Sequence, residues 1–401
     1  MNLADATAPP SGSADLPIPS KRLLSLDAFR GLTVATMILV NNPGDWSNIY
    51  APLRHADWHG CTPTDLVFPF FLFIVGVAIP LAQAARLKRL ALGQTRAALV
   101  PSIVRRSALL FVIGFAISAI PLGARSGILN WPDLRIMGVL QRIAICYCAA
   151  ALVGLFARPR TYVIVAVLLL LGYAALMLLV PVPGHGRGDL SREHNLAAYI
   201  DTHVLGRHVW VKPPRDDPDK LGWEPEGLLS TLPAIATTLL GLLTGHWLRT
   251  NRPAMDKAAG MLVFGVLGAA LGYVLDRTLM PINKGLWTPS YVVYTAGLAL
   301  LALGTCYWLI DVKVYRAWSK PAVIFGMNAI AVFVLSGLIG RLITVKLGAD
   351  GPTLKGVVYS NVFKPLNLSP INASLLYALM WVSVMFLITW VMYRTRLFIK
   401  V

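Results

Sequence analysis

The chain has 401 residues, of which 56% are hydrophobic and 14% are charged. Soluble domains carry about 25% charged residues, so this composition argues against a protein built only of soluble domains. The formal net charge is +17, but Lys and Arg gather in short segments between apolar runs and form no basic stripe interleaved with aromatic residues, which argues against nucleic-acid binding.

Apolar runs recur along the whole chain, and most have roughly the 20 residues that a helix needs to cross about 30 Å of hydrocarbon. They predict ten spans, at residues 26–40, 64–84, 102–120, 135–156, 162–180, 228–248, 260–279, 287–310, 322–343 and 373–393. The expected fold class is therefore all-α, a polytopic transmembrane helix bundle of about ten spans. No internal repeat is visible, which argues against the inverted-repeat architecture of many transporters.

The two ends of the chain are expected on the same side of the membrane. Residues 1–22 are rich in Pro, Ser and Ala, which predicts a disordered tail ahead of a single transmembrane domain at 23–401. Basic residues concentrate in alternate short loops, such as the one at 86–96. Because basic loops usually face the cytoplasm, both termini are expected there, and ten spans satisfy that topology.

Two segments on the opposite, outward side are longer than a connector needs, at residues 41–63 and 181–227. The second carries eight acidic and six basic residues, which makes it acidic within a basic protein. Its Pro, Gly, Trp and His content favours an ordered lid over a cavity, and long ordered loops often carry function. A solvated spacer is the alternative.

Charged side chains within a span cost about 2.5–3.5 kcal/mol each on insertion scales, so they mark cavities or pathways. Arg105 and Arg106 lie near the cytoplasmic end of their predicted span and can reach its surface. Arg142, which follows Gln141, lies about two helical turns from the outer end of its span. That depth predicts a polar cavity in which the guanidinium of Arg142 holds a phosphate or a carboxylate.

The outward segment at 41–63 contains two histidines, His55 and His59. Histidine is the side chain best suited to proton transfer or nucleophilic attack near neutral pH. A neighbouring carboxylate can fix its tautomer, and Asp45, Asp57 and Asp65 lie in or just after this segment. The two histidines are alternatively metal ligands. The loop around them is rich in Pro and Gly and is not a regular helix, so no metal site is expected.

Seven blocks spaced along the chain carry a recognisable pattern. They are SLDAFRG at 25–31, LRHADWHGCTPTDLVFPFFLF at 53–73, RIMGVLQR at 135–142, PVPG at 181–184, EPEG at 224–227, PINKGLWTPSYV at 281–292 and GMNAI at 326–330. In this order they resemble the heparan-alpha-glucosaminide N-acetyltransferase family, including its bacterial NagX-like members. The resemblance implies a transmembrane acyltransferase that passes the acetyl group of cytoplasmic acetyl-CoA to an amino sugar across the membrane.

The resemblance also implies a catalytic set. The histidine of the family's H-x-x-W segment is catalytic and falls on His55, the asparagine that ends the first span falls on Asn41, and the aspartate that starts the second falls on Asp65. The sequence departs from the pattern at His59, where the family commonly has Asn. It departs again at 336–338, where vertebrate members carry a His-Glu pair, and the second departure puts any helper role there in doubt.

Acetyl-CoA is polyanionic, so its passage requires a polar channel with cations at the cytoplasmic mouth. Bringing thioester and amine together contributes through effective molarity, and Asn41 is expected to donate a hydrogen bond to the developing oxyanion, which is worth about 3 kcal/mol in other acyl transfers. The residues expected to bind the donor are Arg105, Arg106, Gln141, Arg142, Asn283, Lys284 and Asn328. Those expected to bind the sugar are Trp58, Glu224, Glu226 and Trp287, the two glutamates through its ammonium group.

The leading hypothesis is an acetyl-CoA-dependent amino-sugar N-acetyltransferase of a bacterial inner membrane, with His55 as nucleophile or general base and no metal. Acetyl-CoA, an amino sugar and the lipid bilayer are its expected partners, and a homodimer is suggested by the family alone. Two alternatives stay open. One is a secondary transporter of sugars or organic anions with Arg142 as the clamp, and the other is an O-acetyltransferase that acts on cell-envelope glycans.

Overall fold

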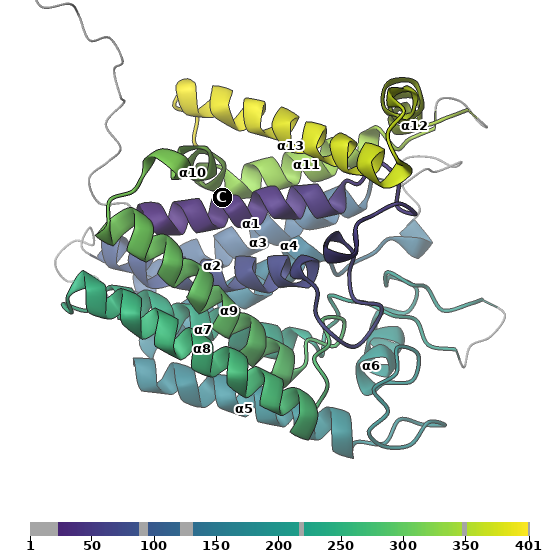
Figure 1. Ribbon diagram of the computed structural model, residues 1–401. Coiled ribbons are helices and arrows are strands. Elements are labelled where there is room, and N and C mark those ends of the chain that lie inside the picture. The colour runs from purple at the N-terminus through teal and green to yellow at the C-terminus, as the bar shows by residue number, and fades with distance from the viewer. Residues whose placement is uncertain (1–22, 88–94, 121–130, 216–219, 347–350, 400–401) are drawn as a thin grey trace, which may run out of the picture.

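The computed structural model describes residues 23–87, 95–120, 131–215, 220–346 and 351–399 (Figure 1). Over these ranges the chain forms helices, turns and isolated β-bridges, without a β-strand. Nine helices in the described part are long and apolar enough to cross a membrane, and a bent pair supplies a tenth span if it is counted as one. The predicted all-α polytopic bundle is confirmed, while the predicted tail at 1–22 lies outside the described residues.

The long helices follow the predicted apolar runs closely, because a backbone surrounded by lipid must satisfy its hydrogen bonds within the segment. They are α1 (Leu24–Asn41), α2 (Val67–Leu87), α3 (Val100–Ser118), α4 (Val139–Phe156), α5 (Pro159–Leu179), α7 (Thr231–Leu248), α8 (Ala254–Thr278), α9 (Pro289–Tyr307) and α13 (Pro370–Arg394).

The predicted span at 322–343 is broken in the structure. It consists of α10 (Lys320–Met327) and α11 (Ala329–Leu342), which meet at an angle of 68° around Asn328. The side-chain amide of Asn328 donates to the carbonyl oxygen of Leu397 at 3.1 Å, and its Oδ1 accepts from the N–H of Ile399 at 3.0 Å. These bonds hold the end of the described chain against the break.

The central helices approach closely because glycines face neighbouring backbones. A methyl group added to Gly76 of α2 would lie 2.1 Å from the carbonyl oxygen of Thr238 in α7, and one added to Gly241 would lie 2.1 Å from that of Phe73. Close backbone packing of this kind stabilises helix association in lipid. In their most apolar stretches, 67% of the residues of α2 and of α7 are buried, against 22% in α3 and in α8, so α2 and α7 form the centre.

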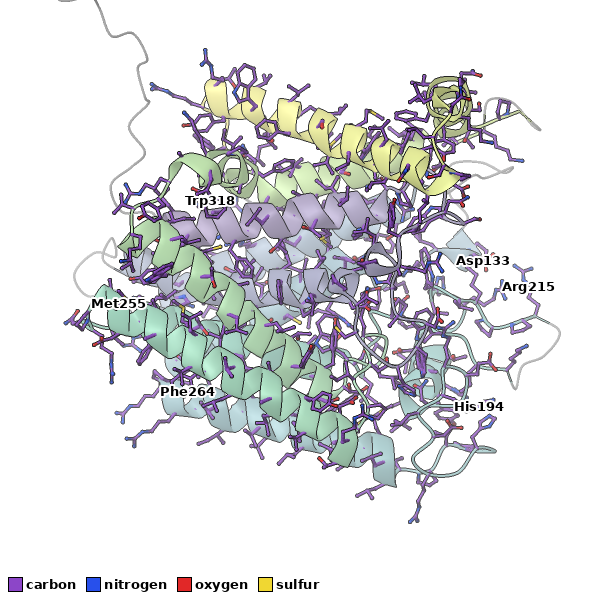
Figure 2. All side chains as sticks on the ribbon, in the orientation of Figure 1. Asp133, His194, Arg215, Met255, Phe264 and Trp318 are labelled. Carbon is purple, nitrogen blue, oxygen red and sulfur yellow. The ribbon has the colours of Figure 1, made fainter. Side chains whose placement is uncertain are left out.

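The outer helices present apolar side chains to the surroundings, as contact with lipid requires. Leu168 of α5 and Phe264 of α8 are both more than half exposed, and Figure 2 labels the position of Phe264.

Two short helices, α6 (Leu196–Leu205) and α12 (Leu354–Val358), lie at one end of the bundle, called the loop end from here (Figure 1). The side chain of Asn195 caps α6. Asp201 on α6 accepts a hydrogen bond from the N–H of Leu228 at 2.7 Å. The segment between α5 and α7 is thereby fastened at the loop end.

Candidate active site

His55 and Asp65 form a hydrogen-bonded pair at the loop end. The Nδ1 of His55 lies 2.6 Å from Oδ1 of Asp65. The other carboxylate oxygen of Asp65 accepts from the N–H groups of Ala56 and Thr62, each at 3.0 Å. The Asp65 side chain is 1% exposed and that of His55 is 46% exposed, so a ligand can reach the imidazole but not the carboxylate.

The sequence Thr-Pro-Thr-Asp at 62–65 fixes this aspartate. Thr62 and Asp65 make a capping box at the start of a short 3₁₀ helix (Pro63–Leu66) that runs into α2, and Pro63 takes the first helical position, where a missing N–H costs nothing. The hydroxyl of Tyr291 donates to the backbone carbonyl of Asp65 at 2.6 Å. Asp65 is therefore held at the head of a central helix.

Lys284 completes the polar group around His55. Its Nζ lies 3.0 Å from Nδ1 and 3.2 Å from Nε2 of His55, and 3.6 Å from Oδ1 of Asp65. Burial lowers the pKa of Lys284 from its ordinary 10.5, against the opposing effect of Asp65. Lys284 was expected to bind the acetyl donor, and the structure places it beside the imidazole.

His55 lies where two cavities adjoin. The aromatic cavity, of about 380 Å³, has walls that include Trp58, Trp210, Trp223, Trp287, Arg192 and Glu226. The long cavity, of about 680 Å³, has walls that include Gly114, Ser118, Gln141, Phe333, Ser336, Gly337 and Lys355. Both have Met37, Asn41, His55, Arg135, Val139 and Trp210 in their walls. The imidazole and Asn41 are thus accessible from two directions.

Of the four residues expected to bind the sugar, three line the aromatic cavity and one does not. Trp58 and Trp287 both line the aromatic cavity, as does Glu226, whereas Glu224 is not among its lining residues. Arg135 contacts both glutamates, with its Nε 2.8 Å from Oε2 of Glu224. Burial opposes ionisation of Glu226, but Arg135 outweighs it and lowers the pKa of that carboxyl, so Glu226 stays charged at the cavity wall.

Sequence reasoning missed Arg135, Arg192, Trp210 and Trp223 as wall residues of the aromatic cavity. The guanidinium of Arg192 lies over the rings of Trp58 and Trp223, at 5.0 and 5.3 Å from their centroids. Arg135 opens the RIMGVLQR block, and the other three belong to the outward segment at 181–227. The two tryptophans of that segment, Trp210 and Trp223, were the available signal, and no local pattern marked Arg135 or Arg192.

Arg142 does not line either of the cavities that meet at His55. It is fully buried, its Nη2 donates to the carbonyl of Gly227 at 3.1 Å, and its guanidinium lies 5.1 Å from the ring centroid of Trp287. Its Nε and Nη1 have no hydrogen-bond partner within the described residues. Arg142 therefore fastens α4 to the segment that leads into α7. Its neighbour Gln141 does line the long cavity.

A third cavity, the cationic cavity, lies at the end of the bundle opposite the loop end and has about 590 Å³. Its walls include Arg30, Arg86, Arg105, Arg106, Gln83 and Tyr147. The guanidinium of Arg106 lies 4.7 Å from the ring centroid of Tyr147, and its Nε is buried without a hydrogen-bond partner among the described residues. The predicted pair Arg105 and Arg106 thus faces a common cavity.

Asn283 and Asn328 were also expected to bind the donor, and both have their amide groups engaged with protein. Asn283 is fully buried, and its side chain donates to the carbonyl of Trp58 at 2.9 Å and accepts from the N–H of Leu286 at 2.8 Å. Asn328 binds residues 397 and 399. Each amide holds together parts of the chain that are distant in sequence.

The two departures from the family pattern lie near the site. Nδ1 of His59 accepts a hydrogen bond from the side-chain amide nitrogen of Asn283 at 3.2 Å. Ser336 lines the long cavity, and its hydroxyl accepts from the indole N–H of Trp381 at 3.0 Å. Over the described residues, no group of three or more His, Cys, Asp or Glu side chains is arranged to hold a metal ion.

Comparison with known proteins gives the family. Residues 22–272 match the family model described as heparan-alpha-glucosaminide N-acetyltransferase, catalytic. The chain is 32% identical over 357 residues to heparan-alpha-glucosaminide N-acetyltransferase of Homo sapiens, covering 78% of this chain and 52% of that protein. It is 31% identical over 360 residues to that of Mus musculus, covering 79% and 53%. The chain spans about half the length of these curated relatives, and it belongs to the heparan-alpha-glucosaminide N-acetyltransferase family.

Proposed function

We propose that the protein is an acetyl-CoA-dependent N-acetyltransferase that moves an acetyl group across the membrane to the amino group of an amino sugar. The observation that carries the proposal is the position of His55. Its imidazole is oriented by the buried Asp65 and lies where the aromatic cavity and the long cavity adjoin. A group in that position can meet one substrate from each cavity.

The donor is assigned to the cationic and long cavities. CoA carries several phosphate charges, and arginine binds phosphate through paired N–H groups. Arg105 and Arg106 supply such groups at the cationic cavity. Both cavities have walls on α3 and α11, and Arg106 and Ser118 are separated by about 18 Å at the helical rise of 1.5 Å per residue. The thioester arm would follow these two helices toward His55.

The acceptor is assigned to the aromatic cavity. Tryptophan faces pack well against the apolar faces of a sugar ring, while a few polar groups fix its orientation. Trp58 and Trp287 supply the faces, and Glu226 supplies a charged carboxylate for the ammonium group. Glu224 would act through Arg135, which it shares with Glu226.

The chemistry follows from the imidazole. Nδ1 of His55 keeps its proton and donates a hydrogen bond to Asp65, which leaves a lone pair on Nε2. In direct transfer, the amine nitrogen attacks the thioester carbon, Nε2 accepts a proton from the amine, and the C–S bond then breaks to release the thiolate. In the two-step route, Nε2 attacks that carbon, the C–S bond breaks, and the acetyl group then passes from His55 to the amine. In both routes the thiolate takes up a proton, and Asn41 hydrogen-bonds to the oxyanion.

Both termini would lie in the cytoplasm of a bacterium, with the loop end in the periplasm. The basic short loops and the cationic cavity would then share the side on which acetyl-CoA is made. The acceptor would enter from the side of α6.

The test is release of CoA by the purified protein with a panel of amino sugars, with products identified by mass spectrometry. We expect His55→Ala to lower kcat by about 10²–10⁴-fold, the usual contribution of an acid–base group, whereas His203→Ala, on the exposed side of α6, keeps the wild-type rate. Full activity in His55→Ala would overturn the assignment. Transfer to hydroxyl groups would favour the O-acetyltransferase, and sugar uptake into vesicles without acetyl-CoA would favour the transporter.

A further inference from the structure

Lys284 contacts both halves of the His55–Asp65 pair, and its position relative to the imidazole is unusual. The distances from its Nζ to the two ring nitrogens, 3.0 and 3.2 Å, are nearly equal. A donor in line with the lone pair of Nε2 would lie much farther from Nδ1 than from Nε2. The amine of Lys284 therefore lies beside the ring and does not block the lone pair that the proposed chemistry uses.

Among Lys284, His55 and Asp65, the carboxylate of Asp65 carries the only negative charge. Asp65 is 1% exposed, and a buried carboxylate needs a nearby positive charge or it is costly to ionise. Lys284 and His55 are the two bases within reach of its Oδ1, at 3.6 and 2.6 Å. Two positive charges within about 3 Å of each other would repel strongly in a poorly solvated site. The arrangement therefore favours a single cation, on Lys284 or on His55.

Other charged groups line the two cavities that adjoin at His55, and each cation among them has a hydrogen-bond partner other than His55. From the two cavities these groups are Asp57, Arg135, Arg192, Glu226, Arg341 and Lys355. Arg135 binds both glutamates, Arg192 contacts the Asp57 carbonyl, and Arg341 and Lys355 donate to the carbonyls of Ile120 and Pro43. Cys61 lies near Lys284 and Asp65 as a neutral thiol, because burial raises its pKa to about 12.

The turn that carries Lys284 is held firmly. The side chain of Asn283 binds the backbone of Trp58 and of Leu286, and a methyl group added to Gly285 would lie 2.9 Å from the ring of Trp58. The N–H of Trp287 donates to the carbonyl of Lys284 at 3.2 Å. This packing keeps the amine at the His55–Asp65 pair.

We propose that Lys284 is a positioning residue for His55: its ammonium group is the counter-charge of Asp65, and it thereby keeps the imidazole uncharged with Nε2 available for reaction. The role in catalysis rests on the proposed function, whereas the effect on the charge of His55 does not. Without the ammonium group, Asp65 would attract the proton to His55. The imidazole would then remain protonated, and unreactive, to a higher pH.

The test measures the charge of His55 directly. Diethyl pyrocarbonate modifies neutral imidazole, so its rate of reaction at His55, followed by mass spectrometry of the purified full chain from about pH 5 to about pH 9, reports where His55 loses its proton. The acidic limb of this profile is the pH range over which the rate of modification rises as His55 loses its proton. In Lys284→Met we expect the acidic limb to move to higher pH by at least about one unit, which is a tenfold change in the protonation equilibrium. Lys284→Arg keeps a cation and should keep the wild-type limb.

Controls separate charge from folding. The exposed His203 in the same sample should titrate alike in every variant, and Lys364→Met on the exposed loop-end segment should leave the His55 limb unmoved. The double variant Asp65→Asn with Lys284→Met removes both charges, so its limb should return toward the wild-type position. An unmoved limb in Lys284→Met and Lys284→Gln, an equal shift in Lys284→Arg, or a shift that persists in the double variant would each overturn the inference.

The same variants distinguish this inference from the proposed function. If the protein is the transferase, the acidic limb of its kcat/KM profile moves with the modification profile of His55. A moved modification profile in a protein that transfers no acetyl group would sustain the role of Lys284 and reject the transferase. A kcat/KM that falls equally at every pH, with an unmoved modification profile, would show Lys284 to be merely structural.

Discussion

Arg106 and Arg142 are arginines within helices of the bundle, yet their guanidinium groups have different surroundings. Arg106 faces the cationic cavity beside Tyr147, with Nε unpaired among the described residues. Arg142 is enclosed between Trp287 and the carbonyl of Gly227. A ligand that enters the cationic cavity can satisfy Nε of Arg106, whereas Arg142 lines neither cavity at His55 and fastens α4 to the segment that leads into α7.

This difference gives a prediction at the scale of one residue. Arg106→Ala should raise KM for acetyl-CoA by about 10–100-fold, because a charge-assisted hydrogen bond contributes about 1.5–3 kcal/mol, while kcat changes little. Steady-state kinetics with varied acetyl-CoA measures this. Lys313→Ala, at the same end of the bundle but outside the cavity walls, should keep the wild-type KM. An unchanged KM in Arg106→Ala would remove Arg106 from the donor site.

The sequence predicted several of the residues that line the cavities at His55, such as Trp58, Glu226 and Gln141, but not the contacts that their side chains make. His55 and Asp65 were predicted as a pair from the family resemblance, and the structure shows how they meet: the capping box at Thr62 and Asp65 places the carboxylate beside the imidazole. Lys284 lies in a turn that is more than 200 residues from His55 in the sequence. The guanidinium of Arg142 packs over Trp287, which is also distant in the sequence. Neither contact leaves a local pattern in the chain.

Individual helices were largely predictable, because the length and hydropathy of a span are set by the bilayer and need no knowledge of neighbours. The break between α10 and α11 was not, since it depends on the bonds of Asn328 with residues 397 and 399. The helix α6 was also not predicted from the sequence. It is short, lies outside the spans, and is held by Asn195 and by the bond from Leu228 to Asp201.

The tether between α6 and α7 predicts a pH dependence of stability. Burial raises the pKa of Asp201 from 3.8 to about 7, against the hydrogen bond from Leu228. Because the folded-state pKa lies above the unfolded value, the stabilising contribution of the protonated acid is largest below about pH 4 and is lost as the pH rises through about 7. The unfolding temperature of the wild type should therefore fall across this window.

Asp201→Asn should remove that dependence. At about pH 8 the variant should be more stable than the wild type by roughly 1–4 kcal/mol, the equivalent of one to three pKa units, and the difference should shrink toward about pH 5. Thermal unfolding of the detergent-solubilised protein at several pH values measures this. A wild type whose stability relative to Asp201→Asn rises with pH would contradict the burial argument.

At the scale of the whole molecule, cavities with different linings lie at the two ends of the bundle. The cationic cavity lies at one end, and the aromatic cavity lies at the loop end, with His55 at the junction of the aromatic and long cavities. Figure 2 shows Asp133, His194 and Arg215 at the loop end, and Met255 and Trp318 toward the other. A polyanionic donor and a hydrophilic acceptor cannot mix through lipid, so this separation fits a reaction whose substrates arrive from opposite sides.

The most direct measurement is acetyl transfer in sealed proteoliposomes whose protein orientation is known from the accessibility of a terminal tag. Acetyl-CoA is supplied on the side of the cationic cavity, and a membrane-impermeant amino sugar on the side of the loop end. We predict that acetylated sugar accumulates on the loop-end side while CoA is released on the donor side, and that His55→Ala lowers both rates by about 10²–10⁴-fold. Transfer that requires both substrates on one side would contradict the account.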